Sequence, residues 1–511
     1  MNEFNFLQSL PAIAPEIGLV ITAIVLLALD SGIPFVYAGL PESRRKGLAL
    51  VTAVSLIATA LMSIAVWSPT PETTGLYWGG MVRYDVLALV FKVMILFAGA
   101  ITALIAVDAE GIGNKGEFYL IMVVSTLGAC LISSASDLIM LFLALETTTI
   151  PLYVLAGFKR GDTRSSESGM KYFLFGSFAS AILLYGLSLL YGFSGQTNLY
   201  AIAEYLSSGA FTANAFPVLA ALVLILVGFG FKISAAPFHF WTPDVYEGAP
   251  TPVTAFLSVA SKAGSFALLM RFLIATFPAA VVINGQEIQN FWVTLVTALA
   301  VVSMTFGNVV ALAQRNVKRL LAYSSIAQAG YTLIGLAAVQ VTATSTGAEA
   351  VAAITYYMFM YTFTNLLAFA VIIVFSEATG TETISDLAGL SRRSPWMALT
   401  LTIALLSLAG VPPAAGFFGK FFLFNAAVQA NLVWLAIVGV LNSIVALFYY
   451  LVIIKVMYVD KGKDEDKPIP ISRTYLYVMG VVSVIVILLG TIGVQPIFDW
   501  ALQGARALLN V

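Results

Sequence analysis

Long apolar runs recur from one end of the sequence to the other, and this recurrence limits the fold more than any other feature. A helix needs roughly 20 mostly apolar residues to cross the hydrocarbon layer of a bilayer. Hydrophobic residues make up 60% of the 511-residue chain and charged residues only 10%, which is too little charge for the surface of a soluble protein of this size. The sequence therefore predicts an all-α polytopic membrane protein.

Fourteen such runs are present, centred near residues 20, 57, 96, 126, 148, 181, 226, 264, 302, 330, 363, 410, 445 and 484. The boundaries at "SSASD" and "VQAN" are the least distinct. The connections are too short for a soluble domain, so residues 1–511 are predicted to form one membrane domain. The start lacks the basic segment of a secretory signal, and the first run is expected to remain as a span.

The distribution of lysine and arginine between the connections predicts how the chain crosses the membrane. Connections after odd-numbered runs hold sixteen of these residues, namely Arg44, Arg45, Lys46, Lys115, Lys159, Arg160, Arg164, Arg315, Lys318, Arg319, Arg392, Arg393, Lys461, Lys463, Lys467 and Arg473. The opposite face holds two, Arg83 and Arg506. Because basic loops stay in the cytoplasm, both termini are expected on the non-cytoplasmic side.

Seven further cations fall inside the predicted spans, namely Lys92, Lys171, Lys232, Lys262, Arg271, Lys420 and Lys455. Arg271 and Lys455 lie near span ends, where a long side chain can reach the membrane surface. Lys92 lies one heptad from Asp85, a candidate structural partner. A lysine at the centre of a span costs about 2.5–3.5 kcal/mol on insertion scales, so the remaining four lysines need another explanation.

The carboxylate of Glu146 lies mid-span in "LIMLFLALETTTIPLYVLAGF". A glutamate at this depth must either bind a proton or pair with a lysine of a neighbouring span. Burial disfavours the ammonium form of lysine, so buried lysines exchange protons near neutral pH. Several lysines and a carboxylate in one bundle therefore predict a polar line that carries protons. The alternative is a buried Glu–Lys pair that only holds helices together.

Two of these lysines stand beside interruptions of a helix. In "FKISAAPFHFW", Pro237 separates Lys232 from His239, the one histidine of the chain, and in "LAGVPPAAGFFGKFF" two prolines at 412–413 precede Lys420. Carbonyls freed by such breaks persist in a membrane only where they face protein or a water-filled cavity. The breaks fall five spans apart, so the two spans cross in opposite directions, as in inverted repeats around an ion path. Two unrelated proline kinks are the alternative interpretation.

Other features exclude several classes of function. With one histidine and one cysteine, the chain cannot build a bis-histidine haem site, a four-cysteine iron–sulfur site or a zinc tetrad. The G-x-G-x-x-G spacing in "GIGNKG" has no strand before it and no room for a dinucleotide fold. A net charge of −1 gives no attraction to nucleic acid. Cys130 is expected to be a small buried residue. No bound cofactor is predicted for this chain.

Four segments carry more specific information: "FKISAAPFHFWTPDVYEGAPTPVTAFLSVASKAG", "IALLSLAGVPPAAGFFGKFFLF", "LFLALE" and "NVKRLLAYSSIAQAGY". Together they resemble the N-type antiporter-like membrane subunits of complex I, the proton-pumping NADH–quinone oxidoreductase, a group that includes the chloroplast and cyanobacterial B subunit. The resemblance implies fourteen helices in two inverted five-helix repeats, helices 4–8 and 9–13 (approximately residues 118–277 and 291–458), with broken helices 7 and 12. By motif it assigns proton translocation to Glu146, Lys232, Lys262 and Lys420, with Lys171 and His239 at secondary polar positions.

The resemblance implies one proton channel of a redox translocase, coupled to quinone reduction in partner subunits. The expected partners are the other antiporter-like and small membrane subunits and the peripheral redox arm, with NAD, FMN, iron–sulfur clusters and quinone in those partners. The protein is expected in a bacterial inner membrane, in contact with lipid. Two alternatives stay open: a subunit of a multi-subunit cation/proton antiporter without a redox partner, and a membrane scaffold that transports nothing.

Overall fold

The computed structural model of the chain describes residues 6–31, 41–209, 211, 214–339, 345–462 and 467–509. The predicted loop cations Arg44, Arg45, Lys46 and Lys463 lie outside the residues whose side chains are described. In the described part, eleven helices are long and apolar enough to cross a membrane, or up to twelve if a bent pair near the C-terminus forms one span. The prediction of an all-α polytopic membrane protein is confirmed.

The first part of the chain forms a series of long helices joined by short connections. Its elements are α1 (Phe6–Ser9), a 3₁₀ turn (Leu10–Ile13), α2 (Ala14–Ser31), α4 (Pro41–Ala65), the hairpin β1 (Gly75–Tyr77) and β2 (Val82–Tyr84), α5 (Val86–Ile105), α6 (Gly116–Ser134), α7 (Leu138–Ala156), α8 (Thr163–Ser194) and α9 (Leu199–Ser207). Asp85, Asp137 and Asp162 start α5, α7 and α8, because each side chain accepts a first-turn N–H that would otherwise be unpaired.

The second part contains the interrupted helices. Its elements are α10 (Phe216–Lys232), α11 (Trp241–Gly248), α12 (Thr251–Phe256), a π-helical turn (Leu257–Ser261), α13 (Lys262–Thr276), the hairpin β3 (Val282–Ile283) and β4 (Gln286–Glu287), α14 (Ile288–Ala311), α15 (Val317–Ala338), α16 (Ser345–Thr379), a 3₁₀ turn (Ile384–Leu387), α17 (Leu390–Arg393), α18 (Pro395–Ala409), α19 (Ala415–Gln429), α20 (Val433–Tyr458), α21 (Arg473–Leu489) and α22 (Val494–Leu509). The bent pair is α21 and α22, which meet at 76°.

Four spans form the buried centre of the bundle: α5, α12 with α13, α15 and α16, in which nearly every residue is buried. The other spans surround them and expose one apolar face each. On α20, for example, Ile437, Val440, Leu441 and Ile444 are exposed, at the three-to-four-residue spacing of one helix face. Polar side chains on the central helices therefore find their partners within the protein.

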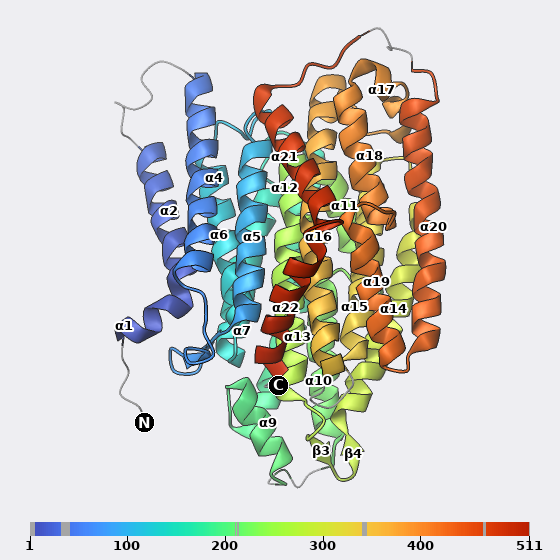
Figure 1. Cartoon of the computed structure of the whole chain (residues 1–511). Coiled ribbons are helices and arrows are strands. Elements are labelled where there is room, and N and C mark those ends of the chain that lie inside the picture. The colour runs from blue at the N-terminus through green and yellow to red at the C-terminus, as the bar shows by residue number, and fades with distance from the viewer. Residues whose placement is uncertain are drawn as a thin grey trace.

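The two ends of the bundle differ. Figure 1 shows α17 at the upper end and α9 with the hairpin β3–β4 at the lower end, where α1 and the end of α22 also lie. The start of α15 is tied to the segment just before α17, since Val317 N donates to the Glu382 carbonyl at 2.9 Å and Lys318 pairs with the Glu382 carboxylate at 2.9 Å. The first described helix, α1, and the end of the last one, α22, therefore lie at the end of the bundle opposite α17 (Figure 1).

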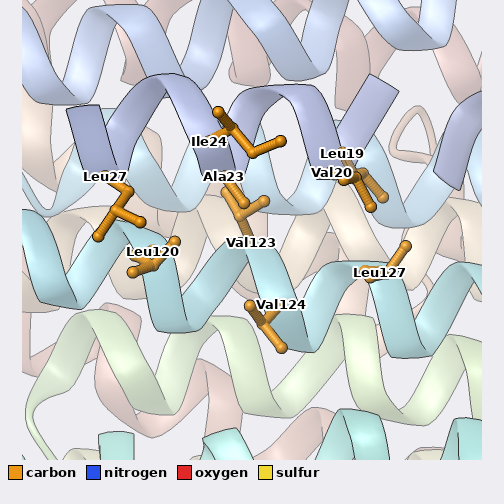
Figure 2. A pocket seen from close by; sticks show the side chains of 9 residues that line it. All are labelled: Leu19, Val20, Ala23, Ile24, Leu27, Leu120, Val123, Val124 and Leu127. Carbon is orange, nitrogen blue, oxygen red and sulfur yellow. The ribbon is translucent and has the colours of Figure 1, made fainter. Parts of the chain in front are cut away.

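A groove on the outer surface between α2 and α6 illustrates the membrane-facing side (Figure 2). Its lining is entirely aliphatic, with Leu19, Val20, Ala23, Ile24 and Leu27 from α2 and Leu120, Val123, Val124 and Leu127 from α6. Such a surface suits contact with hydrocarbon chains rather than water.

Candidate functional site: a line of buried lysines

The helix break expected after Lys232 is present between α10 and α11. The indole Nε1 of Trp241 donates to the Phe231 carbonyl at 3.1 Å, and Ala236 N donates to the Ser303 hydroxyl at 2.9 Å. Backbone groups freed by the break are thus bonded to protein, as a membrane interior requires. Lys232 is 3% exposed and ends α10, where the helix dipole favours a cation.

Glu146 from α7 and Lys232 from α10 lie together, with a serine between them. The Lys232 Nζ is 3.9 Å from Glu146 Oε1. The Ser180 hydroxyl of α8 donates to the same carboxylate oxygen at 2.6 Å and lies 3.4 Å from Lys232 Nζ. Thr149, one turn after Glu146 on α7, accepts from Lys232 at 3.4 Å. Ser180 and Thr149 are parts of this site that the sequence did not single out, because hydroxyls are common in helices and carry no charge.

Lys262 lies at the centre of the bundle and is held by a hydroxyl and a carbonyl. Its Nζ donates to Ser325 Oγ at 2.9 Å and to the Ser325 carbonyl at 3.1 Å. The Tyr246 hydroxyl of α11 lies 3.4 Å from the same Ser325 Oγ. The π-helical turn at residues 257–261 immediately precedes Lys262, a distortion often found at functional sites.

Lys420 lies on α19, just after the second helix break. Its Nζ donates to the Ala409 carbonyl at 3.0 Å, at the free C-terminal end of α18, and sits 4.6 Å from the centre of the Tyr331 ring. Gly416 permits the close return of the chain, since a Cβ there would come within 1.7 Å of the Ser407 carbonyl oxygen. The freed carbonyls of the broken helix therefore serve as the partner of the lysine.

A set of neutral polar side chains connects the surroundings of Lys262 and Lys420. Gln328 of α15 donates to the Leu408 carbonyl at 3.2 Å, beside the carbonyl that holds Lys420, and to the Tyr450 hydroxyl at 3.4 Å. Its carboxamide oxygen accepts from Tyr357. Tyr450 in turn shares a hydrogen bond of 2.5 Å with Ser324, the neighbour of the serine that holds Lys262. One face of α15 thus reaches both lysines.

Lys171, predicted as a secondary member of the line, lies in a different cluster. It is half-buried near the start of α8 and pairs with Glu167 and Asp244, each at 2.7 Å. Asp244 also pairs with Arg319 at 2.8 Å, and Arg319 with Glu247 at 3.0 Å. This cluster ties α8 and α11 to α15, whereas no hydrogen bond or ion pair among the described residues joins Lys171 to Glu146.

His239 and Lys455 make contacts that do not include the buried lysines. The His239 ring packs 4.5 Å from the ring of Phe306, and no hydrogen bond in the described part of the chain joins it to Lys232. The Lys455 side chain is 59% exposed and pairs with Asp460 at 2.8 Å, as expected for a lysine near a span end.

Two other cations that the sequence placed inside spans form tight ion pairs, and both differ from expectation. Lys92 pairs with Glu16 at 2.7 Å and donates to the Ala12 carbonyl at 3.1 Å, so Asp85 is not its partner. Arg271 does not reach the membrane surface: it is fully buried and binds Asp85 with two bonds of 2.7 and 2.9 Å. Both ion pairs join helices that are far apart in the sequence. The seven-residue spacing between Asp85 and Lys92 therefore could not predict them.

Within the described residues, no group of three or more His, Cys, Asp and Glu side chains could hold a metal ion. Cys130 is free and buried. The buried lysines, two of them at helix breaks, place the protein in the class of polytopic membrane proteins that translocate ions.

Comparison with known proteins narrows the class. The family described as "NADH:quinone oxidoreductase/Mrp antiporter, TM" matches residues 135–446. NADH-quinone oxidoreductase subunit N of Moorella thermoacetica is 41% identical over 493 residues, 96% of this chain and 98% of that protein. NAD(P)H-quinone oxidoreductase subunit 2 of Trichormus variabilis is 43% identical over 459 residues, 88% of this chain and 82% of that protein. The chain belongs to this family of antiporter-like membrane subunits.

Solved structures share the fold over nearly the whole chain. A chain of respiratory complex I from Thermus thermophilus superposes with a TM-score of 0.73 at 30% identity, covering 94% of this chain and 98% of that one. A chain of the Mrp complex from Dietzia sp. superposes with a TM-score of 0.80 at 21% identity, covering 99% and 98%. At that lower identity the likeness concerns the fold alone.

Proposed function

We propose that this chain translocates protons across a bacterial inner membrane as a membrane subunit of a quinone oxidoreductase of the complex I type. Relatives named as subunits of NADH-quinone or NAD(P)H-quinone oxidoreductase are 38–43% identical to this chain over most of their length. The chain is then part of a translocase, with other antiporter-like and small membrane subunits and the peripheral redox arm as partners. Those partners bind NAD, FMN, iron–sulfur clusters and quinone. Quinone reduction in the partners drives proton translocation through this chain.

The proton line runs through Glu146, Lys232, Lys262 and Lys420. The observation that carries this assignment is that these lysines lack the tight carboxylate partners of the other buried cations. Lys232 lies 3.9 Å from Glu146, whereas the buried Lys318 pairs with Glu382 at 2.9 Å. Lys92 and Arg271 have carboxylate partners at 2.7 Å. Lys262 and Lys420 are bonded to uncharged oxygens. Loss of a proton from such a lysine leaves no carboxylate stranded in the membrane, so its neutral form is accessible.

Lys171 and His239 take secondary places in this proposal. Lys171 and Arg319 form a part-exposed cluster beside α11 with the carboxylates of Asp244, Glu167 and Glu247. The cluster holds one more carboxylate than it holds cations, so it attracts cations and can exchange protons with water. We assign it to the uptake side of the line. His239 lies within the first break, two residues before α11, where it can hold a proton transiently.

Fourteen spans in inverted repeats remain the proposed topology. Eleven helices qualify alone, and the bent pair α21–α22 adds one. Counting each interrupted pair, α10–α11 and α18–α19, as one span gives the predicted number. Repeats at about 118–277 and 291–458 then run from α6 to α13 and from α14 to α20. With the basic connections in the cytoplasm, the end that holds α9 faces outward, and so do both termini.

A subunit of a cation/proton antiporter without redox partners is the second candidate, because the description of the matching family also names the Mrp antiporter. Copurification separates the two functions. If the complex extracted in mild detergent contains NADH-oxidising or iron–sulfur subunits, the chain serves a redox pump. If it contains only other membrane subunits and exchanges cations for protons, the antiporter function holds.

The assignment of the lysine line is tested with two lysines of equal burial. Lys262 and Lys92 are both 3% exposed, but only Lys262 belongs to the proposed line. In vesicles with the assembled complex, Lys262→Met should remove most of the protons pumped per electron. Lys92→Met strands Glu16 and should reduce the amount of assembled complex, while each assembled complex pumps normally. An unchanged proton-to-electron ratio in Lys262→Met, or an equal loss in both variants, contradicts the assignment.

A further inference from the structure

Arg83 and Arg506 are the two cations predicted for the face opposite the basic connections, and they come together in the structure. They are 423 positions apart in the sequence, yet both line one surface cavity of about 570 Å³. The remaining lining comes from the connection after α4, the first residue of α5 and α22, with Thr70, Thr74, Val86 and Gln503 among its residues. The two cations predicted for the face with the fewest basic residues therefore line one cavity.

Close packing of α22 on the start of α5 fixes this meeting. Gly504 lies so near to α5 that a Cβ there would come within 2.8 Å of the Leu87 backbone. The Arg83 Nη2 also donates to the Ala507 carbonyl at 3.4 Å. The guanidinium of Arg83 is thereby held beside the helix that carries Arg506. The pairing of the two arginines is a feature of the fold rather than a chance approach of flexible side chains.

The cavity carries excess positive charge. Asp85, the nearest carboxylate, uses both oxygens for Arg271 and lies 3.7 Å from Arg83 Nε. The Arg83 Nε is buried and has no hydrogen-bond partner among the residues that the structure describes. The cavity lies beside the N-terminus of α5, where the Asp85 carboxylate already accepts the Ala88 N–H. None of the residues that line the cavity is acidic. The exposed Glu72 belongs to the same connection, between Pro71 and Thr74, but is not part of the lining.

The cavity lies at the level of the membrane surface. It opens where α4 ends and α5 begins, both of them candidate spans. Tyr77 and Tyr84 stack edge to face beside it, and Tyr84 donates to the Trp67 carbonyl. Tyrosine and tryptophan gather at the headgroup level of a bilayer. The lining pairs basic and hydroxyl groups with apolar ones such as Pro69 and Val86, which suits a ligand with a charged head and an apolar tail.

We propose that this cavity binds the phosphate of an anionic phospholipid. Guanidinium groups bind phosphate with two parallel hydrogen bonds, and Arg83 and Arg506 supply the donors for one phosphodiester. The acyl chains continue along the apolar outer faces of the neighbouring spans. This function is independent of the proton line and explains why two cations are retained on a face that otherwise excludes them.

The test compares lipid retention by the assembled complex in nanodiscs of phosphatidylcholine that contain a small fraction of phosphatidylglycerol. Arg506→Gln should lower the affinity for phosphatidylglycerol about tenfold, the loss of one charge-assisted contact, and Arg506→Lys should restore part of it. The matched control is Lys461→Gln, an exposed cation of a basic connection, which should leave retention unchanged. Arg83 is not substituted in this test, because its guanidinium carbon packs 5.2 Å from the centre of the Tyr200 ring and its removal could disturb folding.

Two results overturn the proposal. Equal retention in Arg506→Gln and the unmodified complex shows that the cavity does not select the lipid. Displacement of phosphatidylglycerol by excess inorganic phosphate in detergent shows that the cavity recognises free phosphate rather than a lipid. The proposal predicts that inorganic phosphate does not compete, because the apolar part of the cavity contributes to lipid binding.

Discussion

The two helix breaks hold their lysines in different ways. At the first, Lys232 meets Glu146 and shares Ser180 with it. At the second, Lys420 meets the Ala409 carbonyl and the face of Tyr331, and no ion pair involves it among the described residues. Both ammonium groups lie at the C-terminal end of a helix, where the dipole favours a cation. Both lysines thus lie at a free helix C-terminus, but only Lys232 has a carboxylate as counter-ion.

This difference indicates a division of labour. A lysine that faces a carboxylate changes its proton affinity when the carboxylate moves or changes charge, so the first break can respond to events in neighbouring subunits. A lysine that faces a carbonyl and a ring has no such control. Its ammonium form is favoured only by fixed dipoles, which suits the release of a proton. We therefore regard the first break as the responsive end and the second as the releasing end of the line.

The largest effect is expected from removing the carboxylate. Glu146→Gln leaves Lys232 buried without its counter-ion, a loss of about 3–5 kcal/mol for a tight buried pair and less at 3.9 Å. Proton pumping should fall far more than assembly. Adding Lys232→Met should cost less than the sum of the single changes, with an interaction of about 0.5–3 kcal/mol. Strict additivity of the two changes in pumping and in assembly would show that the residues do not interact.

A smaller effect, on assembly alone, distinguishes the two breaks. Lys232→Met strands the Glu146 carboxylate in the membrane, whereas Lys420→Met strands no carboxylate. The amount of assembled complex should therefore fall further in Lys232→Met than in Lys420→Met, although both stop pumping. Membrane preparations from the two strains, compared by quantitative immunoblotting, measure this. If both variants assemble equally well, the Glu146 counter-ion at the first break does not contribute to the stability of the assembled complex.

The smallest effect is expected at Ser180, which donates to Glu146 at 2.6 Å. Ser180→Ala removes one hydrogen bond to a charged group, about 1.5–3 kcal/mol, but leaves both charges in place. Pumping should decline by a modest factor, and Ser180→Thr, which keeps the hydroxyl, should restore it. The matched control, Ser188→Ala on the same helix, alters an exposed serine and should have no effect. A variant Ser180→Ala that pumps at the normal rate removes Ser180 from the site.

Charge made part of this site predictable from sequence. Glu146, Lys232, Lys262 and Lys420 stand out because each interrupts an apolar run, and proline marks both breaks. The neutral partners do not stand out. Ser180, Ser325 and Gln328 resemble many other polar residues in the helices, and only the packing of α8 and α15 selects them.

Long-range pairing was the other limit of the sequence. Asp85 and Arg271 are 186 positions apart, and nothing local indicates that α5 and α13 are neighbours. Local spacing instead suggested Asp85 for Lys92, whose partner is Glu16 on α2. The helix count and the class of fold depended on apolar length, a local property, and the sequence was sufficient for the class.

The proton-carrier role of Lys420 is the central claim, and Lys420→Arg tests it most directly. A guanidinium keeps the positive charge beside the Ala409 carbonyl but does not release its proton. The measurement is the number of protons pumped per electron in vesicles that contain the assembled complex, with the amount of complex determined in parallel. The account predicts that Lys420→Arg assembles well and loses most of its pumping. Normal pumping in Lys420→Arg would contradict the account and leave Lys420 as a structural cation at the second break.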